Sequence, residues 1–174
     1  MNDLNIKIYS DGADVKEMIL ADKKNLVDGF TTNPTLMARA GITDYLAFAK
    51  EVLSHIKEKS ISFEVFSDDI NEMYKQAMIL KDLGNNVYVK IPVTNTKQEY
   101  TYDLISRLSN EGVKLNVTAL FTKIHIDEVF NALNNNIPSI ISIFAGRIAN
   151  AGLDPEPTMT VSYTHLTLPT SFEV

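Results

Sequence analysis

The sequence predicts an α/β protein whose fold is an incomplete (β/α)8 barrel, or TIM barrel, with about six β/α units present and the last two missing. First, short apolar runs typical of buried strands alternate with helical patterns along the whole chain. Second, polar side chains recur on one face of these strands, near their carboxyl ends. A sheet covered by helices on both faces would be apolar on both, whereas a barrel can carry functional side chains at the top of its interior.

Six strands are expected, at residues 6–11, 27–32, 61–66, 87–93, 113–119 and 139–145. The last four start about 26 residues apart, which is a regular β/α spacing rather than a sequence repeat. A closed barrel at this spacing needs roughly 208 residues, and typical ones have ~250. The 174 residues of this chain therefore fall about two units short.

Helical patterns fill the segments between the strands. Asp14 and Glu17 have the spacing of a capping box at the start of the first helix. Apolar stripes with helical periodicity cover residues 46–56, 70–80, 101–108 and 126–133. Gly84 and Gly112 follow two of these stripes, as expected where helices end.

The composition indicates one globular domain, residues 1–160, because 45% of the chain is hydrophobic and 22% is charged. A net charge of −6 without any basic cluster argues against nucleic-acid and membrane partners. The absence of cysteine excludes disulfides and thiolate catalysis. Residues 1–7 lack the apolar core of a signal peptide, and the longest apolar run, 137–145, is too short to span a bilayer. We therefore expect a cytoplasmic protein.

One face of the predicted strands collects the candidate site. If the aliphatic residues of each strand face the helices, the opposite parity holds Tyr9, Asp11, Thr31, Asn33, Ser62, Glu64, Phe66, Lys90, Asn116, Thr118, Ser142 and Phe144. A lysine near the end of a strand is ordinarily structural, with its ammonium group reaching water. The polar side chains expected around Lys90 favour a reactive amine instead.

A lysine amine in such a setting can perform aldol chemistry. The neutral amine attacks a ketone and forms a Schiff base, which is an electron sink for making or breaking the adjacent carbon–carbon bond. One carboxylate must move the proton of the substrate hydroxyl, and a second group must handle water. Asp11 and Glu64 are the only inward carboxylates available. No metal-ligand cluster is recognisable, since His55 and His125 fall on helices far from the strand ends.

Six segments taken together closely resemble the transaldolase family. They are Asp11-Gly12-Ala13-Asp14, Gly29-Phe30-Thr31-Thr32-Asn33-Pro34-Thr35, Phe63-Glu64-Val65, Val89-Lys90-Ile91-Pro92, Asn116-Val117-Thr118-Ala119-Leu120-Phe121 and Ser142-Ile143-Phe144-Ala145-Gly146-Arg147. Any one of them alone is a weak signal, but the Thr-Thr-Asn-Pro and Lys-Ile-Pro pieces in register with the others are highly specific. The resemblance runs from about residue 6 to residue 155.

The resemblance implies a class I aldolase-type barrel that acts on sugar phosphates with no metal and no organic cofactor. It makes Lys90 the Schiff-base lysine and Asp11 the acid/base for the substrate hydroxyl. It also implies that Glu64 and Thr118 hold the catalytic water. Asn33 and Asn116 would bind the dihydroxyacetone portion of the substrate, and Ser142 and Arg147 would face the sugar phosphate. A guanidinium suits a phosphate because it offers a planar set of donors. Arg147 could otherwise pair with an acid at a helix start.

The expected activity is that of a transaldolase of the pentose phosphate pathway. Glu64 and Phe144 resemble the transaldolase choice, whereas the fructose-6-phosphate aldolase branch tends to carry glutamine and tyrosine there. Two alternatives stay open. One is a fructose-6-phosphate aldolase-like enzyme, and the other is a receiver-like signalling module, suggested by acidic residues after the first strand and a Lys-x-Pro late in the sheet. The oligomeric state is open too, homo-oligomer included.

The end of the chain departs from the family pattern. Residues 161–174 resemble a translated sequencing-adapter sequence, so we expect a non-native tail there; the rival interpretation is a short strand, because Thr and Tyr are good strand formers. The family's second phosphate-binding arginine, expected beyond the sixth strand, is absent. Two missing strands would leave unpaired sheet edges. We expect the complete parent protein to be active and this polypeptide to be poorly soluble and inactive.

Overall fold

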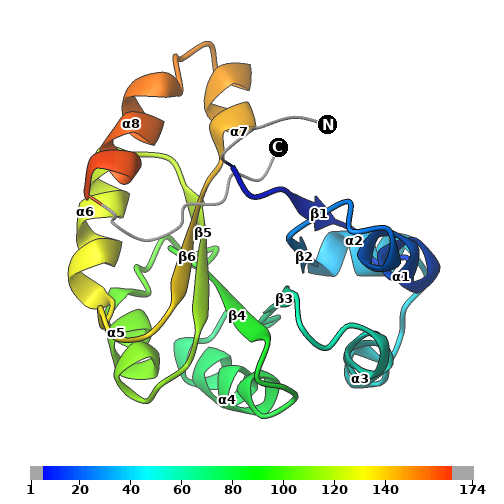
Figure 1. The fold of residues 1–174 in the computed structure, drawn as a ribbon. Coiled ribbons are helices and arrows are strands. Elements are labelled where there is room, and N and C mark those ends of the chain that lie inside the picture. Colours follow the sequence, from blue (N-terminus) through cyan, green and yellow to red (C-terminus); the bar gives the residue numbers. More distant parts are fainter. Residues whose placement is uncertain (1–5, 166–174) are drawn as a thin grey trace.

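The computed structural model describes residues 6–165, which form one curled parallel sheet with helices along its outer side (Figure 1). Neighbouring strands are adjacent in sequence order throughout. The strands are β1 (Tyr9–Asp11), β2 (Gly29–Thr31), β3 (Ser60–Glu64), β4 (Val87–Pro92), β5 (Leu115–Leu120) and β6 (Ser139–Ile143). This is the incomplete (β/α)8 barrel that the sequence predicts. The sequential strand order excludes the doubly wound sheet of the receiver-like alternative.

The helices alternate with the strands (Figure 1). They are α1 (Val15–Lys23), α2 (Pro34–Arg39), α3 (Tyr45–His55), α4 (Ile70–Lys81), α5 (Tyr102–Asn110), α6 (Lys123–Ala132), α7 (Ala145–Asn150) and α8 (Glu156–His165). Side-chain caps fix several of their starts. Asp14 accepts hydrogen bonds from the backbone N–H groups of Lys16 (2.8 Å) and Glu17 (3.0 Å). Such a cap is worth about 1 kcal/mol.

The core lies between the sheet and the helices. In β4, Val87, Val89 and Ile91 are at most 4% exposed and point toward the helical layer, as their alternation predicts. Ile105 and Leu108 of α5 are fully buried, as are Ile126 and Val129 of α6. Burying one such aliphatic side chain stabilises the fold by roughly 1.5–3 kcal/mol. The opposite parity of each strand is thereby left to face the barrel interior.

Two expectations differ from the structure. The first strand is three residues long, and Ile6 and Ile8 before it are each 49% exposed, because β1 is an edge strand within the described sheet. Phe66 lies beyond the end of β3 rather than on its inner face. Its ring is half-exposed and meets Tyr45 of α3 edge-on, with the ring centroids 4.4 Å apart.

The C-terminal segment of the described chain is helical. Residues 161–165 belong to the last turns of α8, so the short strand weighed for this segment is not observed there. Residues 166–174 of the predicted non-native tail lie outside the described residues. The predicted domain boundary at residue 160 falls inside α8 and stays a prediction. None of the helices within residues 6–165 has the length and apolar character needed to cross a lipid bilayer.

Candidate active site

A cavity of about 550 Å³ opens at the carboxyl end of the strands, where barrel enzymes carry their active sites. Seven of the sequence-predicted site residues line it: Asp11, Asn33, Glu64, Lys90, Thr118, Phe144 and Arg147. The wall also includes residues to which the sequence analysis assigned no role, namely Pro34, Thr35, Leu36, Arg39, Pro92 and Ala119.

Lys90 lies in the middle of the sheet and is only 3% exposed. In the parallel register it stands between Glu64 of β3 and Asn116 of β5. Adjacent strands are about 4.8 Å apart, so side chains of one register row on one face are direct neighbours. The fold therefore brings the buried amine next to a carboxylate and an amide.

Asp11 is held at the end of β1 by one donor from β2 and one from the residue that caps α2. Thr31 Oγ1 donates to Asp11 Oδ1 (2.9 Å), and Asn33 Nδ2 donates to Asp11 Oδ2 (3.3 Å). Asn33 also caps α2, because its Oδ1 accepts from the backbone N–H of Leu36 (2.9 Å). A donor on each oxygen fixes the orientation of the carboxylate at the cavity wall.

Asn116 and Ser142 are buried beside the cavity rather than on the wall described above. Asn116 is 0% exposed and Ser142 is 1% exposed. Ser142 Oγ donates to Asn116 Oδ1 (2.7 Å), and Asn116 Nδ2 donates to Ser62 Oγ (3.0 Å). This row of hydrogen bonds crosses β6, β5 and β3 through the barrel interior, so both groups already have protein partners.

Thr118 combines burial with an unused hydroxyl. Its Oγ1 has no hydrogen-bond partner among the described residues, although the side chain is only 2% exposed. The strand bulges directly after it: Val117 pairs with Ile141, but Leu120 pairs with Ile143, and Ala119 between them has a φ of 63°. A buried hydroxyl without a partner is costly unless a bound molecule satisfies it.

Tyr45 supports the end of β3 from outside the cavity, and the sequence did not reveal this role. Its hydroxyl reaches from α3 and donates to the backbone carbonyl of Glu64 (2.9 Å). Burial raises the pKa of the Tyr45 hydroxyl well above its usual value, and the negative charge of Glu64 raises it further. Tyr45 is therefore a neutral donor at the end of β3. No local sequence signal marked it, because its role depends on how α3 packs on the sheet.

Two arginines and an aromatic residue complete the rim. Arg147 of α7 and Arg39 of α2 both line the cavity. The Phe144 ring packs edge-on against Phe121, with centroids 5.7 Å apart. The sequence did not place Arg39 at the site, because α2 has only six residues and is too short to show an apolar stripe that would have predicted a helix there.

Residues 8–166 match the sequence model of a family described as "Transaldolase/Fructose-6-phosphate aldolase". The chain belongs to this family. Three relatives named "Probable transaldolase" come from Dehalococcoides mccartyi (36% identical), a Sulfurihydrogenibium species (36%) and Methanococcus maripaludis strain C5 (35%). Each match covers 86% of this chain but only 65%, 66% and 65% of the relative, respectively. The chain thus spans about 65% of the length of these transaldolase-family relatives.

A solved structure supports the fold of this transaldolase-family chain. The crystal structure of KGPDC from Streptococcus mutans aligns with a TM-score of 0.54 and covers 97% of this chain and 78% of that one. The sequences are 11% identical, so the likeness concerns the fold alone.

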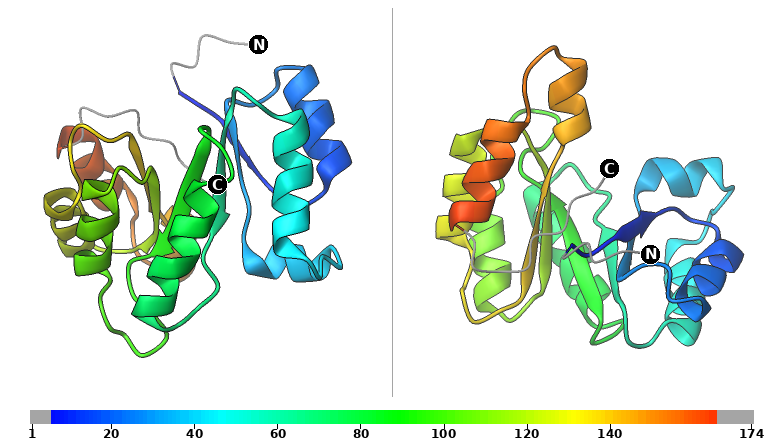
Figure 2. Two further views of the ribbon diagram at one scale, coloured as in Figure 1. Left: turned by 90° about the horizontal axis from the view of Figure 1, so that it is seen from below. Right: turned by 45° about the horizontal axis from the view of Figure 1, so that its top comes forward.

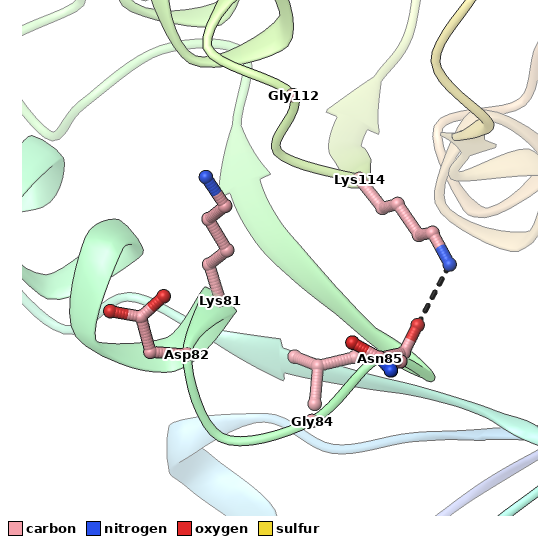
Figure 3. Close-up of a pocket in the computed structure, with 7 residues that line it drawn as sticks. Lys81, Asp82, Gly84, Asn85, Gly112 and Lys114 are labelled. Carbon is pink, nitrogen blue, oxygen red and sulfur yellow. Dashed lines mark hydrogen bonds between the residues drawn. The ribbon is translucent and has the colours of Figure 1, made fainter.

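A second hollow of about 350 Å³ lies at the opposite end of the sheet and lacks the features of a site (Figure 3). Lys114 Nζ donates to the backbone carbonyl of Asn85 (2.7 Å), and Lys81 Nζ donates to that of Glu111 (3.1 Å). Both amines thus serve carbonyls that follow helices α4 and α5, where a positive charge is favourable. Within residues 6–165, no three His, Asp or Glu side chains lie close enough to bind one metal ion.

Proposed function

We propose that the full-length gene product is a transaldolase, which transfers a dihydroxyacetone unit from a ketose phosphate to an aldose phosphate through a Schiff base on Lys90. The observation that carries the proposal is the setting of Lys90. Its side chain is 3% exposed, yet it lines a cavity of about 550 Å³ together with the carboxylates of Asp11 and Glu64. Membership of the family and relatives named as probable transaldolases support the same activity.

The first half of the proposed reaction cleaves the donor. The Lys90 amine adds to the C2 carbonyl of the ketose, whose oxygen leaves as water, and an imine forms. Asp11 takes the proton of the C4 hydroxyl, the C3–C4 bond breaks, and the aldose phosphate departs. The bond electrons stay in the enamine on Lys90. The two hydrogen bonds to Asp11 support this role because they aim its carboxylate at the cavity.

The second half of the proposed reaction runs in reverse on a new aldose phosphate. The enamine carbon attacks the aldehyde, Asp11 returns the proton, and water hydrolyses the imine. Glu64 and Thr118 would hold this water, and the buried Thr118 hydroxyl without a partner among the described residues supports that assignment. Asn33 and Asn116 would bind the dihydroxyacetone portion, while Ser142, Phe144 and Arg147 would face the sugar phosphate.

Composition and the family resemblance support a cytoplasmic enzyme of the pentose phosphate pathway. The fructose-6-phosphate aldolase-like alternative differs only in releasing free dihydroxyacetone. Glu64 and Phe144 favour transfer over release, by resemblance to the transaldolase branch.

Borohydride trapping tests the proposal on the full-length gene product. Fructose 6-phosphate and borohydride should leave a covalent adduct on Lys90, detectable by peptide mass spectrometry, because reduction fixes the imine. The variant K90M should give no adduct and should lose at least about 10³-fold of kcat, since the nucleophile is gone. An active enzyme without an adduct on Lys90 would overturn both aldol mechanisms. Adding erythrose 4-phosphate then separates transfer from simple release.

A further inference from the structure

Ser62 is an inward polar residue to which the proposed function gives no role. It belongs to β3, two residues before Glu64, and its side chain is fully buried. Its Oγ accepts a hydrogen bond from Asn116 Nδ2 (3.0 Å), although β3 and β5 are not neighbours in the sheet. The curl of the sheet brings the inner faces of the two strands together (Figure 2). Ser62 is thus a direct partner of a residue that we propose to bind the substrate.

The hydrogen bond between Ser62 and Asn116 passes close to Lys90. Asn116 is the register partner of Lys90, and Ser62 is the register partner of Tyr88, two residues earlier in β4. The bond therefore spans the inner side of β4 next to the buried amine. Any rotation of the Asn116 amide would take place beside the proposed imine.

The backbone of Ser62 is firmly held. Its carbonyl accepts hydrogen bonds from both the backbone N–H and the Oγ1 hydroxyl of Thr32, each at 3.0 Å. Ile61 and Phe63 on either side are fully buried. A single staggered torsion then places the serine oxygen. Ser62 therefore offers a fixed anchor point inside the barrel.

Two hydroxyls hold the amide of Asn116 by its two ends. Ser142 Oγ donates to Oδ1 (2.7 Å), while Nδ2 donates to Ser62. The terminal torsion of an asparagine is broad, so an amide held at one end only can rotate. With both ends bonded, the amide plane is fixed, and its second N–H and the second lone pair of Oδ1 lie in that plane. The direction of the plane decides where a ligand is met.

The competing explanation is that Ser62 merely satisfies a buried amide. Such a group does need partners. Stability alone does not require the pair, however, because replacing both members of a buried hydrogen bond by apolar groups of the same shape can be nearly neutral. That explanation does not account for an amide buried beside Lys90 in the first place.

We propose that Ser62 is a positioning residue, which fixes the Asn116 amide so that it meets the dihydroxyacetone portion of a ketose bonded to Lys90. The inference rests on the proposed function, which gives Asn116 this contact. Ser62 is not part of the cavity wall and acts through Asn116. Its loss frees one end of the amide. Binding of the dihydroxyacetone portion then weakens, whereas the phosphate contact at Arg147 does not.

The test measures borohydride trapping of Lys90 by fructose 6-phosphate in the full-length gene product. In S62A the half-saturation concentration of the ketose should rise roughly threefold to tenfold, because one positioned hydrogen bond is lost. At half-saturating ketose, the concentration of inorganic phosphate that halves trapping should stay within about twofold, since Arg147 is untouched. S62C nearly keeps the volume of the side chain but offers a poor acceptor, so it should behave as S62A does.

A matched control and a double variant complete the experiment. S109A removes another fully buried serine hydroxyl, which accepts from the backbone N–H of Asn134 (2.9 Å) on α5, away from the cavity. It should leave both concentrations within about twofold of the parent values. In N116A, adding S62A should raise the half-saturation concentration by no more than about twofold, because Ser62 then has no amide to position.

Other results contradict the inference. If S62A shifts the ketose and phosphate values by the same factor, Ser62 has a structural role only. If S62A and S62C leave the half-saturation concentration unchanged, Asn116 does not depend on Ser62. If the full effect of S62A persists in N116A, Ser62 acts by another route. Failure of the proposed function looks different, since the parent enzyme itself would then give no adduct on Lys90.

Discussion

Ala119 has a backbone conformation that residues with a side chain rarely adopt. Its φ of 63° lies in the left-handed region, where Asn25 and Gln98 are the other non-glycine residues of the described chain. Such a conformation costs about 1–3 kcal/mol and persists only where surrounding structure enforces it. Here it forms the bulge after Thr118, on the cavity wall. The strain thus coincides with the position that aims a candidate water-binding hydroxyl.

Substitutions at Ala119 should separate strain from side-chain size. A119G should leave the free energy of unfolding within about 1 kcal/mol of the parent, because relief of strain offsets the added chain entropy. A119V should lower it by at least about 2 kcal/mol, since a β-branched residue tolerates this φ worst. Urea denaturation of the full-length protein measures both.

Gly112 provides a control that measures the cost of a left-handed backbone without a steric clash. Its φ is 79° and a Cβ atom built on it meets nothing within 4 Å, so G112A should cost about 1 kcal/mol from backbone strain alone. Equal stability of A119G and A119V would show that the left-handed backbone at residue 119 is not enforced.

At the scale of the elements, the side chain of Asp68 connects the loop after β3 to the loop after β4 by hydrogen bonds. Asp68 accepts hydrogen bonds from Thr96 N on Oδ1 and from Thr96 Oγ1 on Oδ2, both at 2.7 Å. Asn95 Nδ2 adds a contact to the Asp68 carbonyl (3.2 Å). These loops border a hollow that shares Glu64 and Pro92 with the cavity of Lys90. Asp68 therefore holds one side of the candidate site in place.

The Asp68 contact should weaken in acid. The backbone and hydroxyl hydrogen bonds from Thr96 hold the pKa of Asp68 below its usual value of 3.8. A carboxyl with a lowered folded-state pKa stabilises the fold fully above about pH 4 and loses that contribution as pH falls toward the folded value. The Thr96 amide resonance should therefore titrate below about pH 4 in NMR spectra.

A neutral variant checks this assignment. D68N should abolish the titration of the Thr96 amide, whereas D127N, which makes the same charge change on α6, should leave it in place. Titration of that amide in D68N with an unchanged midpoint would show that another acid controls the loop.

The elements also show what the sequence could predict. Strand parity and helical stripes placed the six strands and the helices α3, α4, α5 and α6, because both periodicities are local and follow directly from burial. No stripe marked α8, whose last residues the sequence analysis assigned to a non-native tail. The short helices α2 and α7 escaped, since six residues hold too few apolar positions for a stripe. For the same reason Arg39 was missed. Tyr45 was missed because its contact with the Glu64 carbonyl arises only when α3 packs on the sheet.

At the scale of the whole molecule, the net charge is negative, whereas the main cavity holds more cationic than anionic side chains. The chain carries a net charge of −6, yet its main cavity gathers Lys90, Arg39 and Arg147 against Asp11 and Glu64. Global charge would repel an anionic sugar phosphate, but screening at physiological salt limits that repulsion to about 8 Å. The local cations would then decide the binding of the proposed substrate. Composition argues against polyanionic partners in general, but only the fold could bring these five charges together.

The open sheet edges govern the behaviour of these 174 residues as an isolated polypeptide. Within the described chain, β1 and β6 each pair on one side only, and Ile6 and Ile8 beside β1 are half-exposed. Unpaired edges next to apolar side chains promote association between chains. We therefore expect the isolated polypeptide to form concentration-dependent oligomers at roughly 100 μM, measured by sedimentation velocity.

A charge placed at the β1 edge should reduce that association. I8K should shift the sedimentation profile toward monomer, because a lysine at an edge strand opposes pairing with another chain. I124K is the matched control, since Ile124 is 68% exposed but lies on α6, away from the sheet edge. If I124K suppresses the oligomers as well as I8K does, general surface hydrophobicity drives association rather than the edge. A monodisperse monomer in the unaltered polypeptide would show that β1 and β6 are tolerated as open edges.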